Sequence, residues 1–251
     1  MAVEEIKPYN QETDKAEQVE EMFDNIAPSY DFMNHAMTFG LDRVWRNKAI
    51  SLLKTDLPHS ADLQLLDVAC GTGDITFALA DRLKPCKVTG IDLSPGMLRE
   101  AEQKLQSDKF AAFRESVTFQ EADCLKLPFN DDSFDAVTVA YGVRNFENLL
   151  AGYQEMRRVL KPGGIICVIE LCEPKNWIVN AGYHVYSRGI IPLIGKLVSG
   201  DRKAYAYLLE SIKSCPSRDN MLALMREAGF HETKYKVLFP GTVAVYLAKK
   251  A

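Results

Sequence analysis

A glycine-rich turn near residue 70 carries the first residues whose types and spacing could do chemistry. It has the sequence DVACGTGD (67–74) and lies between an apolar run and a helical pattern. Gly71 and Gly73 allow the backbone to approach a ligand closely. A dinucleotide fingerprint needs a third glycine where Thr76 stands, and Asp74 places a carboxylate where phosphates would sit. The turn therefore favours a ligand whose positively charged end lies here.

Acidic residues also end the next two apolar runs. Asp92 lies 19 residues after Gly73, where a carboxylate can accept from both ribose hydroxyls, and Asp123 stands beside Cys124, where it can hold the exocyclic amine of adenine. An adenosine with a cationic tail is S-adenosylmethionine, and the turn resembles the cofactor motif of class I methyltransferases. The predicted cofactor-binding residues are Tyr30, Asp67, Gly71, Thr72, Gly73, Asp92, Asp123 and Cys124. The alternative is that these are turn glycines and strand-end acids of an ordinary α/β protein.

The elements that must position these residues follow from the hydrophobic pattern. Apolar runs at 63–69, 87–93, 117–123, 134–143 and 165–171 alternate with helical patterns. Such alternation predicts parallel strands with helices on both faces of the sheet. Segment 234–250 is interpreted as two strands around a Pro-Gly turn. We therefore expect an α/β fold, with a doubly wound, mostly parallel seven-stranded sheet and a terminal antiparallel strand pair.

We expect a single domain over residues 1–251, because no repeat or Ser/Gly-rich linker interrupts the chain. Within it, 1–60 is predicted as an N-terminal arm and helical lid, 61–172 as the cofactor-binding core, 173–233 as substrate cap and helices, and 234–250 as the terminal strand pair. The first 21 residues hold seven acids against two lysines, which predicts a solvated arm. Residues 30–40 (YDFMNHAMTFG) are interpreted as a loop between helices.

Composition narrows the function classes. The chain is 47% apolar, which is typical of a folded globular protein, and its formal charge of -4 argues against nucleic acid as a partner. Six cysteines without CxxC pairs and four unclustered histidines predict free thiols and no metal site. The sequence shows neither a secretory signal nor a stretch of about 18 apolar residues, so we expect a cytoplasmic protein.

Two further signatures identify a family. The stretch Tyr30-Asp31-Phe32-Met33-Asn34 and the stretch Tyr141-Gly142-Val143-Arg144-Asn145, together with RVLKPGG (158–164) and Glu170, resemble the ubiquinone/menaquinone biosynthesis C-methyltransferases. The similarity runs from about Met22 to the C-terminus. Asp42 stands where the family often has His, and Cys172 where it often has Ser. These departures leave the reaction class intact.

The resemblance implies transfer of a methyl group to a ring carbon of a reduced polyprenyl quinone. That carbon becomes nucleophilic when its ring hydroxyl loses a proton, so the site needs a group that stabilises an oxyanion. The predicted catalytic residues are Arg144, which would hold the phenolate, Asn145, which would orient the ring oxygen, and Asp31 as general base. One alternative is that Arg144 pairs structurally with a carboxylate such as Asp31. Tyr30 is predicted to lie against the sulfonium or to pack in the lid.

A polyprenyl quinol is the expected substrate, most directly demethylmenaquinol, with a methoxy-polyprenyl-benzoquinol as the alternative. The apolar segment from Trp177 to Val198 would cap its pocket, and it would also suit peripheral contact with a membrane surface. A homodimer is left open. Two other functions are weighed: a non-catalytic scaffold that binds S-adenosylmethionine, and a nicotinamide-dependent oxidoreductase, which Asp74 and Thr76 disfavour.

Overall fold

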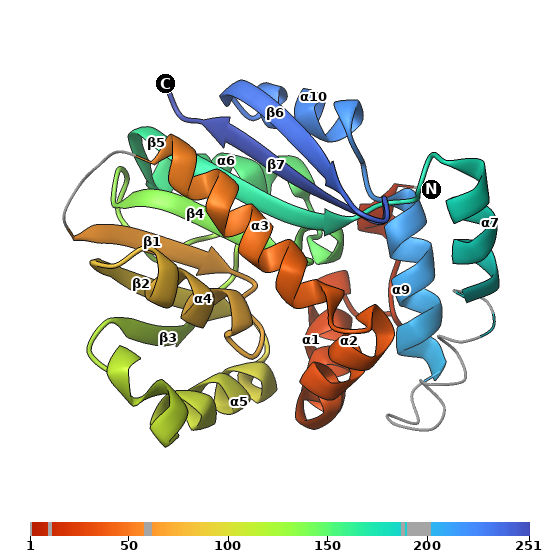
Figure 1. Ribbon diagram of the computed structural model, residues 1–251, viewed down its shortest axis with the longest axis horizontal. Coiled ribbons are helices and arrows are strands. Elements are labelled where there is room, and N and C mark those ends of the chain that lie inside the picture. The colour runs from red at the N-terminus through yellow and green to blue at the C-terminus, as the bar shows by residue number, and fades with distance from the viewer. Residues whose placement is uncertain (1, 10–11, 58–61, 187–188, 190–201) are drawn as a thin grey trace.

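A computed structural model describes residues 2–9, 12–57, 62–186, 189 and 202–251. Its centre is one seven-stranded sheet in the order β3-β2-β1-β4-β5-β7-β6 (Figure 1). The strands are β1 Leu63–Val68, β2 Cys86–Asp92, β3 Val117–Glu121, β4 Phe134–Ala140, β5 Leu160–Leu171, β6 His231–Leu238 and β7 Val243–Lys249. The first five strands run parallel, and β7 pairs antiparallel with both β5 and β6. The predicted fold class is confirmed.

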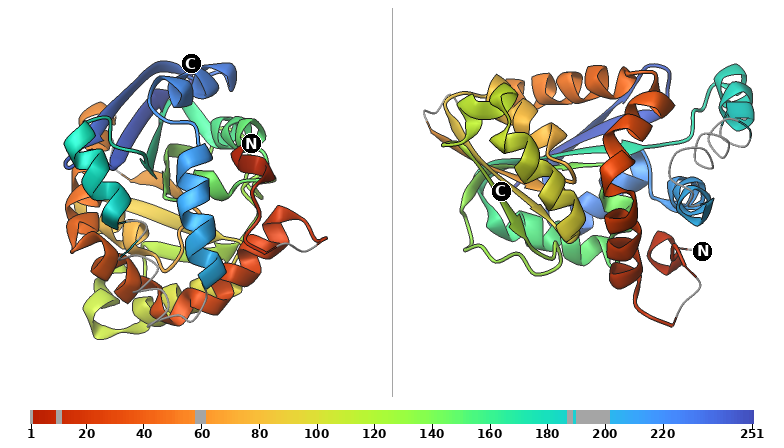
Figure 2. Two further views of the ribbon diagram at one scale, coloured as in Figure 1. Left: turned by 90° about the vertical axis from the view of Figure 1, so that its right-hand side faces the viewer. Right: turned by 90° about the horizontal axis from the view of Figure 1, so that it is seen from below.

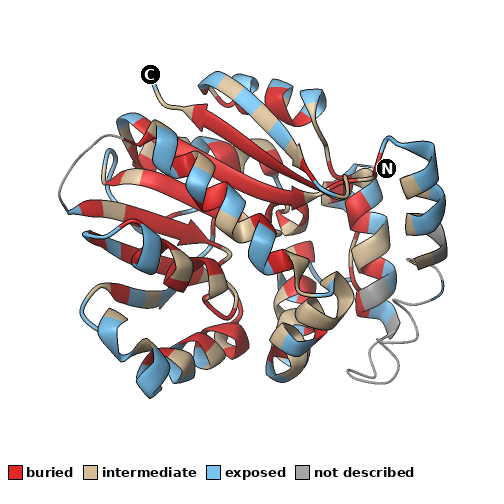
Figure 3. Ribbon diagram, viewed as in Figure 1, coloured by how far each residue is buried: buried red, intermediate tan, exposed pale blue. Residues whose placement is uncertain are grey.

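Helices cover both faces of this sheet and its carboxyl edge. In the described residues they are α1 Lys15–Ile26, α2 Tyr30–Thr38, α3 Leu41–Asp56, α4 Asp74–Arg82, α5 Pro95–Gln106, α6 Leu149–Val159, α7 Trp177–Val185, α9 Arg202–Ser214 and α10 Asp219–Glu227. One apolar cluster joins α3 and α4 to one face, and another joins α6 and α10 to the other. The central strands are buried along nearly their whole length (Figure 3). Burial on both faces explains why they appear in the sequence as continuous apolar runs.

Two predictions about the N-terminal region are wrong. Residues 30–38 form helix α2 rather than a loop, and the helix ends where Phe39 and Gly40 both adopt left-handed backbone conformations. Its buried side chain, Met33, packs near Leu208 of α9, so contacts from a distant segment hold the helix. The predicted solvated arm is docked on the domain instead, with Val3, Ile6 and Tyr9 buried.

The helices that flank the strand ends lie together at one end of the molecule. Figures 1 and 2 show α1, α2, α7 and α9 there, beyond the carboxyl ends of the parallel strands. Ligands of doubly wound sheets bind outside these carboxyl ends. The fold thus places both the glycine-rich turn and the predicted lid beside the same edge of the sheet.

Candidate active site

Two strand ends open a space at the carboxyl edge of the sheet. Ala69 follows β1 and Tyr141 follows β4, and both adopt a left-handed backbone with φ of 51° and 57°. Position 142, where the two strand ends approach each other, requires glycine, because a Cβ there would lie 2.7 Å from the Cβ of Ala69. Strained backbone of this kind is concentrated at functional sites. The two turns therefore mark this edge as the candidate site.

A cavity of about 500 Å³ lies on the side of the lid. Its wall is mostly apolar and comes from α2, α3, α7, α9 and the strand ends. Residues that line it include Met37, Phe39, Leu41, Trp45, Ala140, Leu171, Val179, Tyr183, Tyr186, Leu208 and Ile212. Of the predicted cap, α7 and α9 contribute to this wall, while residues 190–198 lie outside the described part of the chain. The size and polarity suit a ring-shaped apolar substrate.

A smaller cavity of about 90 Å³ lies on the side of β2 and β3. It is lined by five of the predicted cofactor residues: Tyr30, Gly71, Asp92, Asp123 and Cys124. Asp67 and Thr72 line the larger cavity instead, while Gly73 is buried against Phe77 and Phe119. Tyr30, Ala69, Gly71, Ala140 and Tyr141 line both cavities. The two spaces thus share a wall.

Asp92 shapes the glycine-rich turn directly. Its Oδ2 accepts from the Gly71 N–H at 2.7 Å, and its Oδ1 accepts from the Ser94 N–H at 3.0 Å. Burial raises the pKa of Asp92, and the backbone donors oppose that rise. A Cβ at Gly71 would meet only Tyr30 Cε1, at 3.9 Å, so the turn leaves its backbone open to a ligand. The residues present fit an adenosine held by its ribose at Asp92.

Asp67 is fully buried at the end of β1 and is satisfied by two hydroxyls. Thr76 donates to it at 2.6 Å and Thr138 at 2.7 Å. Burial raises its pKa to about 6, although both hydrogen bonds oppose the shift. Thr76, which occupies the place of a third fingerprint glycine, therefore has a structural role as a donor to Asp67.

Asp74 meets cations that the protein itself supplies. Arg46 of α3 lies 3.0 Å from Asp74 and Lys104 of α5 lies 3.2 Å from it. Burial alone would raise the pKa of Asp74, but these two cations hold it below its usual value. The sequence predicts that the Asp74 carboxylate faces the cationic end of a ligand. In the structure this carboxylate pairs with Arg46 and Lys104. Neither cation was predicted from the sequence.

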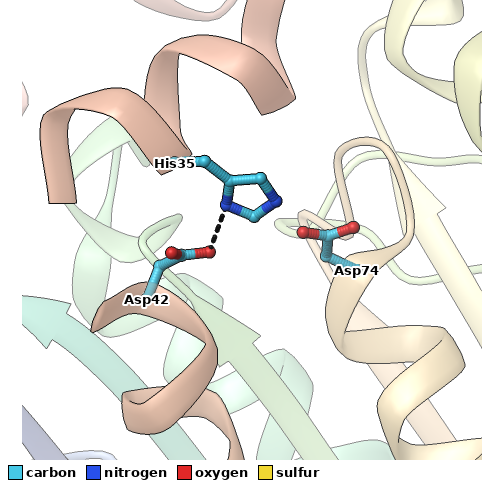
Figure 4. Close-up of side chains that lie close together, drawn as sticks. All are labelled: His35, Asp42 and Asp74. Atoms are coloured by element: carbon cyan, nitrogen blue, oxygen red, sulfur yellow. Dashed lines mark ion pairs between the residues drawn. The ribbon is translucent and has the colours of Figure 1, made fainter. Parts of the chain in front are cut away.

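His35, Asp42 and Asp74 form a polar cluster between the lid and the turn. Each offers a metal-ligand atom, and these atoms lie within 4.8 Å of one another (Figure 4). His35 Nδ1 lies 2.8 Å from the Asp42 carboxylate. The Arg46 guanidinium pairs with Asp42 at 2.9 Å and with Asp74 at 3.0 Å. Because Arg46 pairs with both carboxylates and Lys104 adds a second cation at Asp74, the cluster forms an ionic link between α3 and α4. Asp42, the departure from the family pattern, lies at its centre.

Asp31, the predicted general base, lies beside the turn rather than in the larger cavity. Its Oδ1 accepts from the Thr72 hydroxyl at 2.5 Å, and its Oδ2 forms a close ion pair with Lys104. Lys104 also donates to the Thr72 carbonyl at 3.0 Å. Among the described residues that line the larger cavity, Asp31 is not present. These contacts tie the lid to the turn.

Arg144 is 6% exposed and lines the larger cavity from the short 3-10 turn Val143–Asn145. Its Nη1 donates to Glu170 at 3.0 Å and closely to the Tyr141 carbonyl. Arg144 thus has a carboxylate partner, as the alternative reading of the sequence predicted, but that partner is Glu170 rather than Asp31. Burial would lower the pKa of Arg144, but Glu170 raises it above the usual value. Its buried Nε has no hydrogen-bond partner among the described residues.

Asn145 follows on the same turn but faces another direction. Its Oδ1 accepts from the Tyr207 hydroxyl of α9 at 3.0 Å, and it lines the smaller cavity and not the larger one. The Tyr141 hydroxyl is buried, lines both cavities and has no hydrogen-bond partner in the part of the chain that the structure describes. In the sequence, Tyr141 and Glu170 belong to the family signatures, but nothing there predicts a role for either side chain.

A family model describes residues 11–250, almost the whole chain, as the ubiE/COQ5 methyltransferase family. The chain belongs to this family. A relative from Porphyromonas gingivalis, named demethylmenaquinone methyltransferase, is 44% identical and the alignment covers 98% of both chains. Another from Geotalea daltonii, named ubiquinone/menaquinone biosynthesis C-methyltransferase UbiE, is 39% identical over 95% of this chain and 98% of its own.

A solved structure supports the fold of this family member. A SAM-dependent methyltransferase from Thermotoga maritima superposes with a TM-score of 0.63 at 18% identity, covering 92% of this chain and 99% of its own. At that identity the likeness shows the fold alone. Among the described residues, no helix combines the length and apolar character that crossing a bilayer requires.

Proposed function

We propose that this protein methylates a ring carbon of a reduced polyprenyl quinone, with S-adenosylmethionine as methyl donor, and that the acceptor is demethylmenaquinol. The observation that supports this most is the shared wall between two cavities, one polar at Asp92 and Asp123 and the other apolar and about 500 Å³. Direct transfer requires the acceptor carbon to reach the sulfonium, so the two ligands would meet beside the residues that line both cavities. The substrate named for the Porphyromonas gingivalis relative supports the naphthoquinol.

On the donor side, the residues divide the ligand between them. Asp92 would accept from the ribose hydroxyls, while Asp123 and Cys124 would border the adenine in the smaller cavity. The methionine part would lie along the open backbone of Gly71 toward Thr72 and Asp67, which line the larger cavity. Tyr30 packs over Gly71 and would place its ring near the sulfonium. S-adenosylmethionine supplies the methyl group when bound.

On the acceptor side, Arg144 would stabilise the developing phenolate. Its guanidinium is fixed by Glu170 at 3.0 Å, and its Nε, without a partner among the described residues, remains free to donate to a ring oxygen. The role of Asn145 at this oxygen stays a prediction, since Asn145 lines the smaller cavity and its Oδ1 accepts from Tyr207. The base role of Asp31 stays a prediction, and its contacts with Thr72 and Lys104 favour a role in holding the lid. In the reaction the ring carbon would take the methyl group as the sulfonium S–CH₃ bond breaks and S-adenosylhomocysteine leaves, and the proton of that carbon would pass to water.

Much of the rate would come from positioning and exclusion of water. Residues of α2, α3, α7 and α9 close the apolar cavity over the strand ends. Holding the reacting groups in line inside such a cavity can provide effective molarities of about 10⁵ M or more. The lid and the turn therefore matter as much as any single polar group.

Peripheral membrane contact remains part of the proposal. Four exposed apolar side chains lie on or next to the wall of the larger cavity: Phe39, Trp177, Ile178 and Phe239 are 62–82% exposed. A cavity of about 500 Å³ would hold the ring and the start of a prenyl tail, so the rest of the tail would leave past these side chains. Exposed aromatic residues at the opening suit a lipid surface. The homodimer and the cytoplasmic location stay predictions.

The test uses the purified protein with S-adenosylmethionine labelled in its methyl group. Short-chain demethylmenaquinol and a demethylated benzoquinol are supplied in parallel under reducing conditions, and label is measured in the organic phase. We expect label in the naphthoquinol. Label in the benzoquinol alone would shift the proposal to ubiquinone biosynthesis. Cofactor binding without transfer to either ring would favour the scaffold.

A further inference from the structure

The N-terminal segment holds the turn that carries Arg144 and Asn145. Lys15, at the start of α1, is a charged residue with only 2% of its surface exposed. Its ammonium donates to the carbonyls of Val3 at 2.7 Å, Arg144 at 3.1 Å and Phe146 at 3.1 Å. An ammonium has three protons to donate, and here all three are used.

Neighbouring contacts join the same two segments. The Ala16 N–H donates to Glu147 at 2.7 Å, and Glu4 accepts from the Leu149 N–H at 3.3 Å. Val3 is 1% exposed and belongs to the apolar cluster that includes residues of β4 and α6. Residues 3–9 and 12–19 thus form a strap across the outside of the 143–147 turn, while Glu170 fixes the Arg144 side chain from the inside.

Burying a cation costs desolvation free energy even when all its protons are donated, so Lys15 is present at an energetic cost that a neutral residue would avoid. The contribution of the cation is to orient the backbone of the turn. It fixes the peptide carbonyls of Arg144 and Phe146, which lie on either side of Asn145, and so fixes the backbone from which both predicted catalytic side chains project.

We propose that Lys15 is a positioning residue for methyl transfer, which holds the 143–147 turn so that Arg144 and Asn145 face their ligands. This inference rests on the proposed function of those two residues. The reacting groups do not touch Lys15, and its effect passes through the backbone of the turn.

A pH dependence follows from the same contacts. Burial lowers the pKa of Lys15 to about 8; the groups that face it are Glu4, Cys215 and Glu147, which raise the pKa, and Arg144, which lowers it. A neutral amine has two protons, so one of the three carbonyls loses its donor as the pH rises through about 8. We expect kcat to fall in this range. Stability should not fall with it, since between about 8 and 10.5 the unfolded chain holds more protons at this group than the folded one.

The experiment compares Lys15→Met with Gln18→Leu, a matched control one turn along α1. Gln18 is also fully buried, but its amide contacts Tyr9 and Thr13 within the strap and none of the turn carbonyls. We expect Lys15→Met to lower kcat at saturating substrates by roughly tenfold to a hundredfold. Hydrogen exchange over 143–147 should quicken in the same variant. Gln18→Leu should leave both close to wild type. Equal losses in the two variants, or a Lys15→Met kcat within twofold of wild type, would overturn the proposal.

Lys15→Arg and the pH profile decide the matter if Lys15→Met does not fold. Arginine keeps its charge at high pH, so its kcat should lack the decline near pH 8 that wild type shows. The same decline in both proteins would remove Lys15 as its source. Wild-type turnover is measured in each series, so an inactive wild type points to failure of the proposed function, whereas hydrogen exchange still reports on Lys15.

Discussion

The smaller and the larger cavity differ in how far apart along the chain their residues lie. The smaller one draws mainly on the ends of β1, β2, β3 and β4 and the residues that directly follow them. The larger one combines the ends of β1, β4 and β5 with α2, α3, α7, α9 and the turn between β6 and β7. Strand order brings most of the first set together, whereas the second depends on the packing of distant segments. In the proposed assignment, the donor site therefore depends mainly on the topology of the sheet, and the acceptor site depends on the lid.

The two cavities also differ in how their polar groups are satisfied. In the smaller cavity, Asp92 accepts two hydrogen bonds from the protein itself. In the larger cavity, Arg144 Nε is buried without a partner among the described residues, and so is the hydroxyl of Tyr141, a residue that lines both cavities. A buried donor without a partner is costly, and a ligand oxygen would relieve that cost. This difference yields four tests.

The largest expected effect concerns Arg144. Arg144→Ala should lower kcat by about 10²–10³ with cofactor affinity nearly unchanged, the scale of losing one oxyanion donor. It would also leave Glu170, which is 1% exposed, without its cation, so the single variant should be destabilised. The double variant Arg144→Ala/Glu170→Gln should recover thermal stability but not turnover. Steady-state kinetics with thermal melting checks this, and wild-type kcat in the double variant would show a purely structural arginine.

Asp92→Ala should act on the other cavity. Losing the ribose acceptor and the bond to Gly71 should weaken S-adenosylmethionine binding by about a hundredfold, as expected for charge-assisted hydrogen bonds worth roughly 1.5–3 kcal/mol each. Calorimetry measures the affinity directly. Asp123→Ala is the control, since Asp123 is exposed and should lose less than tenfold. Unchanged affinity in Asp92→Ala would remove it from the ribose site.

Tyr141→Phe tests the unpartnered hydroxyl. If this group donates to an acceptor oxygen, its removal should lower kcat/KM for the quinol by about tenfold and leave cofactor affinity unchanged. Burial raises the pKa of Tyr141, so the hydroxyl stays protonated and can donate. The melting temperature should hold or rise, because the variant removes a buried polar atom that has no partner among the described residues. A lower melting temperature with unchanged kcat/KM would mean a structural role.

The same contrast explains what the sequence could predict. The strands were predicted because residues buried on both faces of a parallel sheet form apolar runs, and the strand-end acids came with them. Helix α2 was missed because polar residues such as Asn34 and His35 obscure its pattern, while Met33 is held by a distant helix. The roles of Lys15 and Glu170 were missed for a related reason. Lys15 contacts a carbonyl 129 positions away, and residue type alone does not reveal that a charge is buried.

Replacement of Asp31 has the smallest expected effect. It separates two roles for this residue, general base and contact that holds the lid. A general base would lose about 10²–10⁴ in rate on replacement by Asn. Asn keeps an acceptor for the Thr72 hydroxyl and loses only the charge opposite Lys104, so a lid-holding role predicts a fall in kcat of less than about threefold. Lys104→Met should lower kcat at least as much, because it removes the same ion pair together with the contacts to Asp74 and the Thr72 carbonyl. A loss of a hundredfold in Asp31→Asn, with Lys104→Met unaffected, would restore Asp31 as the base and extend the catalytic residues from the strand ends into the lid.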